Sequence, residues 1–178
     1  IAVCFVDFGG PGAAREYLRK IEDPAWGMTL LEKLGRVYLE EKEDYPNAIL
    51  ACNLLLDTGP SYGDAPRIQM RIADCYRLLK DESRAFEARQ KLFLIYRTGS
   101  AWWNAVPDKR CRFEAGPLCE QALRDNFQWL IRRAENSSQG LPLYRQSVEL
   151  GRSYLEYFPD DVNALLVRWN LALVLDTK

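Results

Sequence analysis

The chain has 178 residues, of which 48% are apolar, and its formal net charge is −1. This length suits one domain, and the apolar content excludes a disordered tail. The balanced charge argues against a nucleic-acid-binding protein, whose basic face would show as a clear positive excess.

Proline and glycine divide the chain into a series of predicted helices. They span residues 1–8, 12–22, 25–41, 46–57, 65–79, 82–97, 117–135, 141–157 and 160–176. The loops between them are short, except for an irregular insertion near residues 98–116. No apolar stretch approaches the length of about 20 residues that spans a bilayer, so we expect no membrane span.

One pattern recurs along these helices. A small residue is followed by an aromatic residue three positions on, and by a second small residue nine or ten positions beyond that. The copies are Ala2–Phe5–Ala14, Gly35–Tyr38–Ala48 and Ala73–Tyr76–Ala85. Small residues let two helix backbones approach where they cross, and the aromatic side chain fills the space beside the crossing. The pattern therefore predicts antiparallel helical hairpins stacked as a solenoid.

The second copy resembles the tetratricopeptide repeat (TPR) family, a 34-residue helix–turn–helix repeat. Residues that match the family's Leu, Gly, Tyr, Ala and Pro positions are Leu34, Gly35, Tyr38, Ala48 and Pro60. The resemblance implies an all-α, TPR-like solenoid of helical hairpins, with about three to four repeats in a single domain over residues 1–178. After the insertion, Ile131 is the best candidate for the next small-residue position.

The repeat phase also predicts what lies at the two ends. It places residue 1 within the first helix of a repeat and residue 178 just after another such helix. Terminal repeats normally carry a polar capping face, whereas both ends here would expose apolar faces. We therefore expect a fragment of a longer array that can associate through its exposed terminal repeats.

In the TPR family the first helix of each repeat lines an inner groove that holds a protein or peptide partner. The resemblance implies that helix faces turned away from the second helix bind the partner here. These positions are Glu32, Arg36, Arg67, Met70, Asp74, Arg77, Gln128 and Arg132, with Asp125 beside them. Arg36 and Asp74 stand where the chaperone-binding subfamily has asparagine, so its carboxylate clamp is not reproduced. The alternative for each position is an ordinary solvated helix face.

The cysteines fall into two groups. Cys4, Cys52 and Cys75 occupy predicted core positions, where cysteine acts as a small hydrophobe. Cys111 and Cys119 lie eight positions apart across a Gly–Pro turn and form a candidate disulfide. Two free thiols are the alternative, and a metal site with two ligands and no histidine is disfavoured. A disulfide would place the chain in the bacterial periplasm or cell envelope, and free thiols would place it in the cytoplasm.

The insertion contains two adjacent tryptophans, Trp102 and Trp103. Because neighbouring side chains in a loop do not both face one core, we expect one of them to pack under the loop. An exposed binding anchor is the alternative, since tryptophan is common at interfaces.

Catalytic signals are absent from the sequence. There is no histidine, which excludes Ser–His and Cys–His nucleophile pairs, and there is no phosphate-binding glycine loop. We therefore expect a non-catalytic protein–protein interaction scaffold without cofactor or metal. The irregular loops resemble bacterial envelope-associated TPR proteins, such as those of gliding-motility and outer-membrane assembly systems. The alternatives are a docking or regulatory TPR domain of a larger enzyme and, less favoured, a solenoid that binds a lipid or peptidoglycan fragment.

Overall fold

The computed structural model describes residues 9–18, 20, 24–138 and 140–176, and within them every regular element is an α-helix. The helices are α2 (Gly10–Leu18), α3 (Pro24–Glu40), α4 (Tyr45–Thr58), α5 (Ala65–Leu78), α6 (Glu82–Tyr96), α7 (Ala101–Ala105), α8 (Lys109–Glu135), α9 (Gly140–Tyr157) and α10 (Ala164–Asp176). The prediction of an all-α fold is confirmed for these residues. The helix predicted over residues 1–8 lies outside them.

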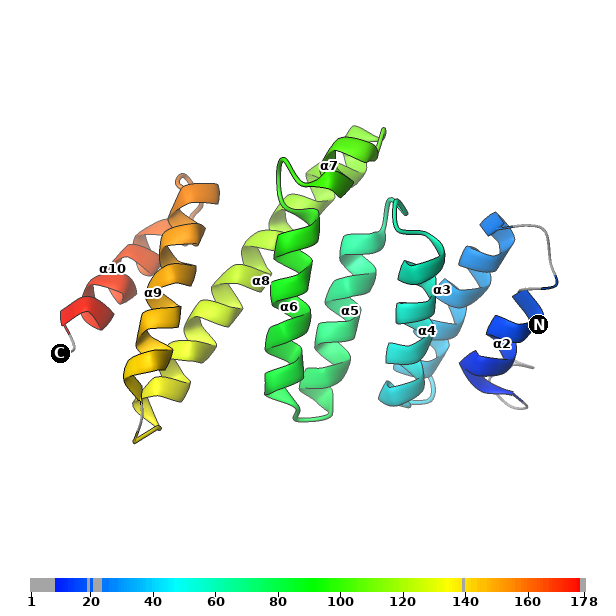
Figure 1. Cartoon of the computed structure of the whole chain (residues 1–178), viewed down its shortest axis with the longest axis horizontal. Helices are drawn as coiled ribbons and strands as arrows, with labels where there is room; N and C mark the ends of the chain where they lie inside the picture. The colour runs from blue at the N-terminus through cyan, green and yellow to red at the C-terminus, as the bar shows by residue number, and fades with distance from the viewer. Residues whose placement is uncertain (1–8, 19, 21–23, 139, 177–178) are drawn as a thin grey trace.

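The helices pack as successive pairs. α3 packs against α4, α5 against α6 and α8 against α9, while α4 packs on α5, α6 on α8 and α9 on α10. Figure 1 shows these elements following one another along the longest axis of the molecule, from α2 near the N-terminus to α10 near the C-terminus. The inner helices α4, α5, α6, α8 and α9 therefore each pack on two or more neighbours.

Aspartate caps define where the second helices of two pairs begin. Asp44 Oδ1 accepts a 3.2 Å hydrogen bond from the backbone N–H of Asn47, and Asp81 Oδ1 accepts a 3.0 Å bond from that of Arg84. A side-chain acceptor at this position satisfies one of the backbone donors that a helix leaves free at its start. The predicted starts near residues 46 and 82 are accordingly confirmed within one residue.

Small residues lie where paired helices cross. A Cβ atom on Gly35 would lie 3.0 Å from Cys52 Sγ, so only glycine gives α3 and α4 this separation without displacing a neighbour. In the α8–α9 pair the small residue is on the other helix, because a Cβ on Gly151 would lie 2.9 Å from Phe127 Cε2. The crossing residue of α8 is therefore Phe127, one turn before the predicted Ile131.

The segment predicted as an irregular insertion, residues 98–116, is largely helical. It contains α7 and the first two turns of α8, and Pro117 lies inside α8 and not at its start. Asp108 caps α8 by accepting a 2.8 Å bond from the backbone N–H of Arg110. Pro117 is exposed, so the backbone carbonyl that its missing N–H leaves free can be solvated, and the helix continues through it.

One of the two tryptophans, Trp102, packs in the core as the sequence predicts, but Trp103 contacts the same core as well. Trp102 is buried, its indole N–H donates a 3.1 Å bond to the backbone carbonyl of Tyr62, and its ring meets that of Tyr96 edge-on. Trp103 is half-buried against the same core. The pair therefore anchors α7 on the α5–α6 pair and presents no fully exposed tryptophan.

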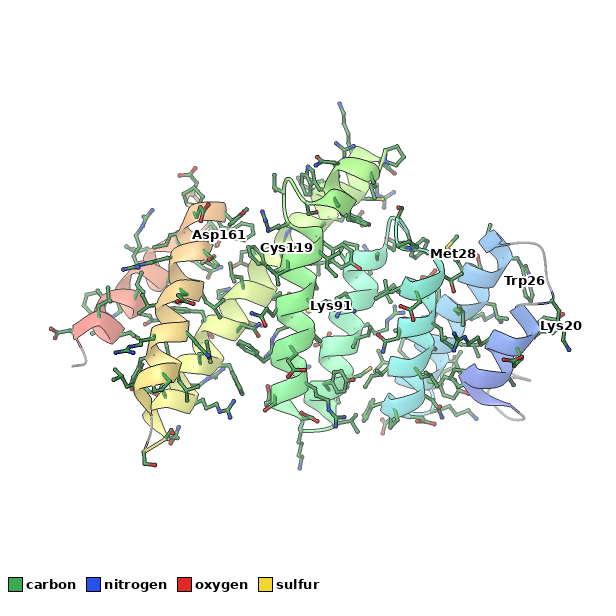
Figure 2. The ribbon with its side chains drawn as sticks, viewed as in Figure 1. Lys20, Trp26, Met28, Lys91, Cys119 and Asp161 are labelled. Atoms are coloured by element: carbon green, nitrogen blue, oxygen red, sulfur yellow. The ribbon has the colours of Figure 1, made fainter. Side chains whose placement is uncertain are left out.

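The prediction of a disulfide between Cys111 and Cys119 is wrong. Both thiols are free and both lie on α8, where residues eight apart are separated by about 12 Å along the axis. A disulfide needs Cα atoms within about 7 Å of each other. Cys119 is buried, and burial raises its pKa to about 12, so this thiol is an unreactive core residue. Figure 2 marks its place on α8.

Candidate functional site

The surface has two neighbouring hollows, which are lined mainly by α5, α8 and α10. The central hollow, of about 330 Å³, lies between α5, α6 and α8. It is lined by Met70, Ala73, Asp74, Arg77, Glu82, Arg89, Gln121, Asp125, Trp129 and Arg132. The distal hollow, of about 290 Å³, lies between α8, α9 and α10. It is lined by Gln128, Ile131, Arg132, Glu135, Tyr144, Asn170, Leu173 and Val174.

The structure brings five of the predicted groove residues to these hollows. They are Met70, Asp74 and Arg77 on α5 and Gln128 and Arg132 on α8. Arg132 lines both hollows, so the two surfaces meet at this side chain. These predicted side chains, with Asp125 beside them, therefore cluster on α5 and α8, and the α10 residues of the distal hollow were not among them.

The other three predicted residues lie elsewhere. Arg67 donates a 2.7 Å hydrogen bond to Glu114 on α8 and lines a small separate hollow with it. Glu32 accepts a 2.8 Å bond from the hydroxyl of Tyr62, and Arg36 is exposed on α3. Neither of the α3 residues lines the central or the distal hollow. Arg67 pairs with Glu114 because α8 begins at residue 109, eight residues earlier than predicted, and so includes Glu114.

Charges in the central hollow are largely paired. Asp74 lies 3.6 Å from Arg77, Glu82 lies 3.7 Å from Arg89, and Asp125 lies 3.6 Å from Arg124. Burial raises the pKa of Asp74 above its ordinary value, and the Arg77 guanidinium partly opposes this shift. No ion-pair partner lies within 4 Å of Arg132 in the part of the chain that the structure describes. Arg132 is thus the cation in this hollow that remains available to a ligand.

Arg89 and Asn126 form a buried link between α6 and α8. Arg89 Nε donates a 2.7 Å bond to Asn126 Oδ1, and Asn126 Nδ2 donates a 2.9 Å bond to the backbone carbonyl of Phe86. Both side chains are almost fully buried, and burial lowers the pKa of Arg89. Because a buried guanidinium is costly unless hydrogen-bonded, this link fixes the wall of the central hollow.

Neither Arg89 nor Asn126 was predicted from the sequence as a functional residue, although the sequence contains a signal for both. Arg89 lies four positions after Ala85 and three before Leu92, both fully buried. Asn126 lies four positions after Ala122 and four before Leu130, both of which are also buried. Polar side chains on the apolar stripe of a predicted helix indicate a buried hydrogen bond to a neighbouring element.

Trp129, which lines the central hollow, is held by an aromatic and a cationic neighbour. The Phe86 and Trp129 rings lie 5.0 Å apart between centroids, and the Arg133 guanidinium lies 4.8 Å from the Trp129 ring centroid. These contacts hold the indole ring against α6. Trp129 therefore presents a positioned surface to the hollow.

A second buried polar cluster ties α8, α9 and the turn before α10 together. The Tyr154 hydroxyl lies 2.6 Å from Glu120 Oε1 and 2.8 Å from Asp161 Oδ1. Arg124 Nε donates a 2.8 Å bond to the same Glu120 oxygen, and Asn163 contacts both carboxylates through its amide. Figure 2 shows Asp161 at the end of α9. The cluster sets the position of α10 and hence the shape of the distal hollow.

Comparison of the chain with protein-family models, with curated proteins and with solved structures found no match. Among the described helices, none is both long and apolar enough to span a membrane. Across the described ranges, no group of three Asp, Glu, Cys or His side chains is arranged to hold a metal ion.

Proposed function

We propose that this chain is a non-catalytic, TPR-like scaffold that binds a segment of a partner protein along the central and distal hollows. The observation that carries the proposal is that Arg132 lines both hollows. Side chains from α5, α8 and α10 thereby contribute to one surface. The sequence resemblance to TPR proteins supports the same use of these helices.

The composition of the surface also supports binding over catalysis. Two arginine–carboxylate pairs, Arg77–Asp74 at 3.6 Å and Arg89–Glu82 at 3.7 Å, lie in the central hollow with Met70 and Trp129, while Arg132 makes no such pair with a described residue. Arginine and tryptophan are the residues most often found to dominate binding energy at interfaces. Mixed charge on a hollowed surface selects a partner by complementarity.

The proposal is tested by reversing charge at the two arginines that line the surface from α5 and α8. The partner is identified by pull-down and mass spectrometry, and its affinity is then measured for wild type and for the Arg77→Glu/Arg132→Glu variant. We expect affinity to fall by at least about tenfold, since one charged hydrogen bond contributes about 1.5–3 kcal/mol. The Arg77–Asp74 pair is exposed and 3.6 Å long, so its loss leaves stability nearly unchanged.

The matched control is Arg145→Glu/Arg152→Glu, which makes the same change in charge on exposed positions of α9 outside both hollows. This control should retain wild-type affinity. Equal affinity for all three proteins would place the binding surface elsewhere and contradict the proposal.

A further inference from the structure

The distal hollow has an apolar wall that remains partly open. Ile131, Tyr144, Leu173 and Val174 form this wall, from three different helices. Val174 is buried, whereas the side chain of Leu173 is 52% exposed at the rim. An apolar side chain that entered the hollow would cover this rim and remove its surface from water.

Two opposite charges flank the apolar wall. Arg132 and Glu135 line the hollow one helical turn apart on α8, a spacing that puts their Cβ atoms about 5–6 Å from each other. Yet no ion pair within 4 Å joins either of them to any described residue. A ligand of a single charge sign would satisfy one of these side chains and be repelled by the other.

Two amide side chains face the same hollow from different helices. Gln128 on α8 and Asn170 on α10 line it, and neither side chain makes a hydrogen bond to the described part of the chain. An amide offers both a donor and an acceptor, which is what the main chain of a bound peptide requires. The hollow thus combines an apolar wall, two amides and a pair of unpaired opposite charges.

From these features we infer that the distal hollow receives a partner segment in which a large apolar residue is flanked by one acidic and one basic residue. The inference rests on the proposed function and names the chemistry of the partner. The apolar side chain packs between Ile131 and Leu173, the acidic group meets Arg132 and the basic group meets Glu135. Because Arg132 also lines the central hollow, the acidic end of the segment points towards α5.

The probes are short synthetic peptides, labelled with a fluorophore, with serine and glycine at every position except three. Leucine occupies the centre, and aspartate, lysine or serine occupies each flanking position in every combination. Fluorescence polarisation then reports binding to the purified chain. We expect the peptides with one acidic and one basic flank to bind best. Two like charges should weaken binding by at least about tenfold, and serine in place of leucine should abolish it.

A charge swap makes the test specific for this hollow. Wild type should prefer one order of the flanking charges, and the Arg132→Glu/Glu135→Arg variant should prefer the opposite order with similar affinity. Unfolding or a general loss of affinity does not produce such an inversion. The control Arg152→Glu, on the exposed surface of α9 and outside the hollow, should keep the wild-type order.

Several outcomes would overturn the inference. Binding without preference for charge order, or the same preference in the swapped variant, would show that Arg132 and Glu135 do not contact the flanking charges of the peptide. The inference also fails if no probe binds while Arg77→Glu/Arg132→Glu abolishes binding of the natural partner, and in that case the proposed function stands. If the probes do not bind and the natural partner is unaffected by that double variant, both proposals fail.

Discussion

Arg89 Nε donates a 2.7 Å hydrogen bond to Asn126 Oδ1, and this bond joins α6 to α8 along the wall of the central hollow. Asn126 is 1% exposed and Arg89 is 6% exposed, so the guanidinium is held where water hardly reaches it. The Glu82 carboxylate lies 3.7 Å from the same guanidinium. Asn126 therefore keeps a buried cation in place without neutralising it, and the surrounding surface depends on that position.

Asn126→Ala should destabilise the chain. The change leaves both Arg89 Nε and the carbonyl of Phe86 without their buried partner, which costs about 2–3 kcal/mol. Urea denaturation measures the loss, with the exposed neighbour Gln121→Ala as the control that should remain near wild type. Arg89→Met combined with Asn126→Leu should recover part of the loss, because it removes both polar groups together. Additive losses in the double variant would show that the two side chains are not coupled.

Tyr154→Phe tests the polar cluster that positions α10. The Tyr154 side chain is fully buried, and its hydroxyl contacts carboxylates on α8 and in the turn before α10. Losing this donor should reduce the free energy of unfolding by about 1–3 kcal/mol. Tyr45→Phe is the control, since the Tyr45 hydroxyl makes no hydrogen bond to the described residues. Equal, small effects of the two changes would refute the role given to this cluster.

The acid side of the stability profile should depend on Asp161. The backbone N–H of Asn163 holds the pKa of Asp161 below its ordinary value, and the Tyr154 hydroxyl acts in the same direction. A carboxylate whose pKa is lowered on folding stabilises the fold above its unfolded pKa of about 3.9. That contribution is lost as pH falls through the folded pKa. Asp161→Asn removes the charge, so thermal melting from about pH 5 to pH 2 should show its deficit shrinking. A deficit independent of pH would contradict this assignment.

Gly151→Ala tests the crossing of α8 and α9. The added Cβ would meet Phe127 Cε2 at 2.9 Å and Leu171 Cδ1 at 3.3 Å, and Phe127 is fully buried. Overpacking of this kind should cost about 1–3 kcal/mol in thermal or urea unfolding. Gln146→Ala, at an exposed site on the same helix, should change stability by no more than about 0.5 kcal/mol. A variant Gly151→Ala as stable as wild type would mean that the helices do not cross here.

Much of the fold was predictable because local signals agreed with the packing. Proline at residues 24, 46 and 66 lies in the first turn of a helix, where proline is favoured, and aspartate caps precede α4 and α6. Gly35 and Ala48 were recognised as crossing residues from their spacing alone, and both are buried. Each of these features depends on residues close to one another in the sequence, so it can be predicted from the sequence pattern.

The misplaced features depend on tertiary context. Pro117 was interpreted as a helix break, but it lies within α8 because its position is exposed. The error moved the start of α8 and made Cys111 and Cys119 seem to flank a turn. Because of the same error, Glu114 was not predicted as the hydrogen-bond partner of Arg67. At the α8–α9 crossing the small residue, Gly151, lies on the second helix of the pair and not on the first. The predicted crossing residue of α8, Ile131, is therefore one helical turn after the observed one, Phe127.

The candidate site was predictable in part for the same reason. Met70, Asp74 and Arg77 repeat at helical spacing on α5, and they do line one hollow. Arg89 and Asn126 come from α6 and α8, and only the packing of these helices brings them together. The sequence therefore predicts the α5 residues of the central hollow but not the buried Arg89–Asn126 hydrogen bond behind them.

The central claim is that the partner lies along α5, α8 and α10, and site-specific photocrosslinking measures this most directly. A photoreactive phenylalanine derivative is placed at Gln121, in the central hollow, or at Gln128, in the distal hollow, and the partner from the pull-down is added. The comparison site is Gln146, which is exposed on α9 outside both hollows. We predict crosslinks to the partner from Gln121 and Gln128 and none above background from Gln146. Crosslinks from Gln146, with none from the two hollow positions, would contradict the account.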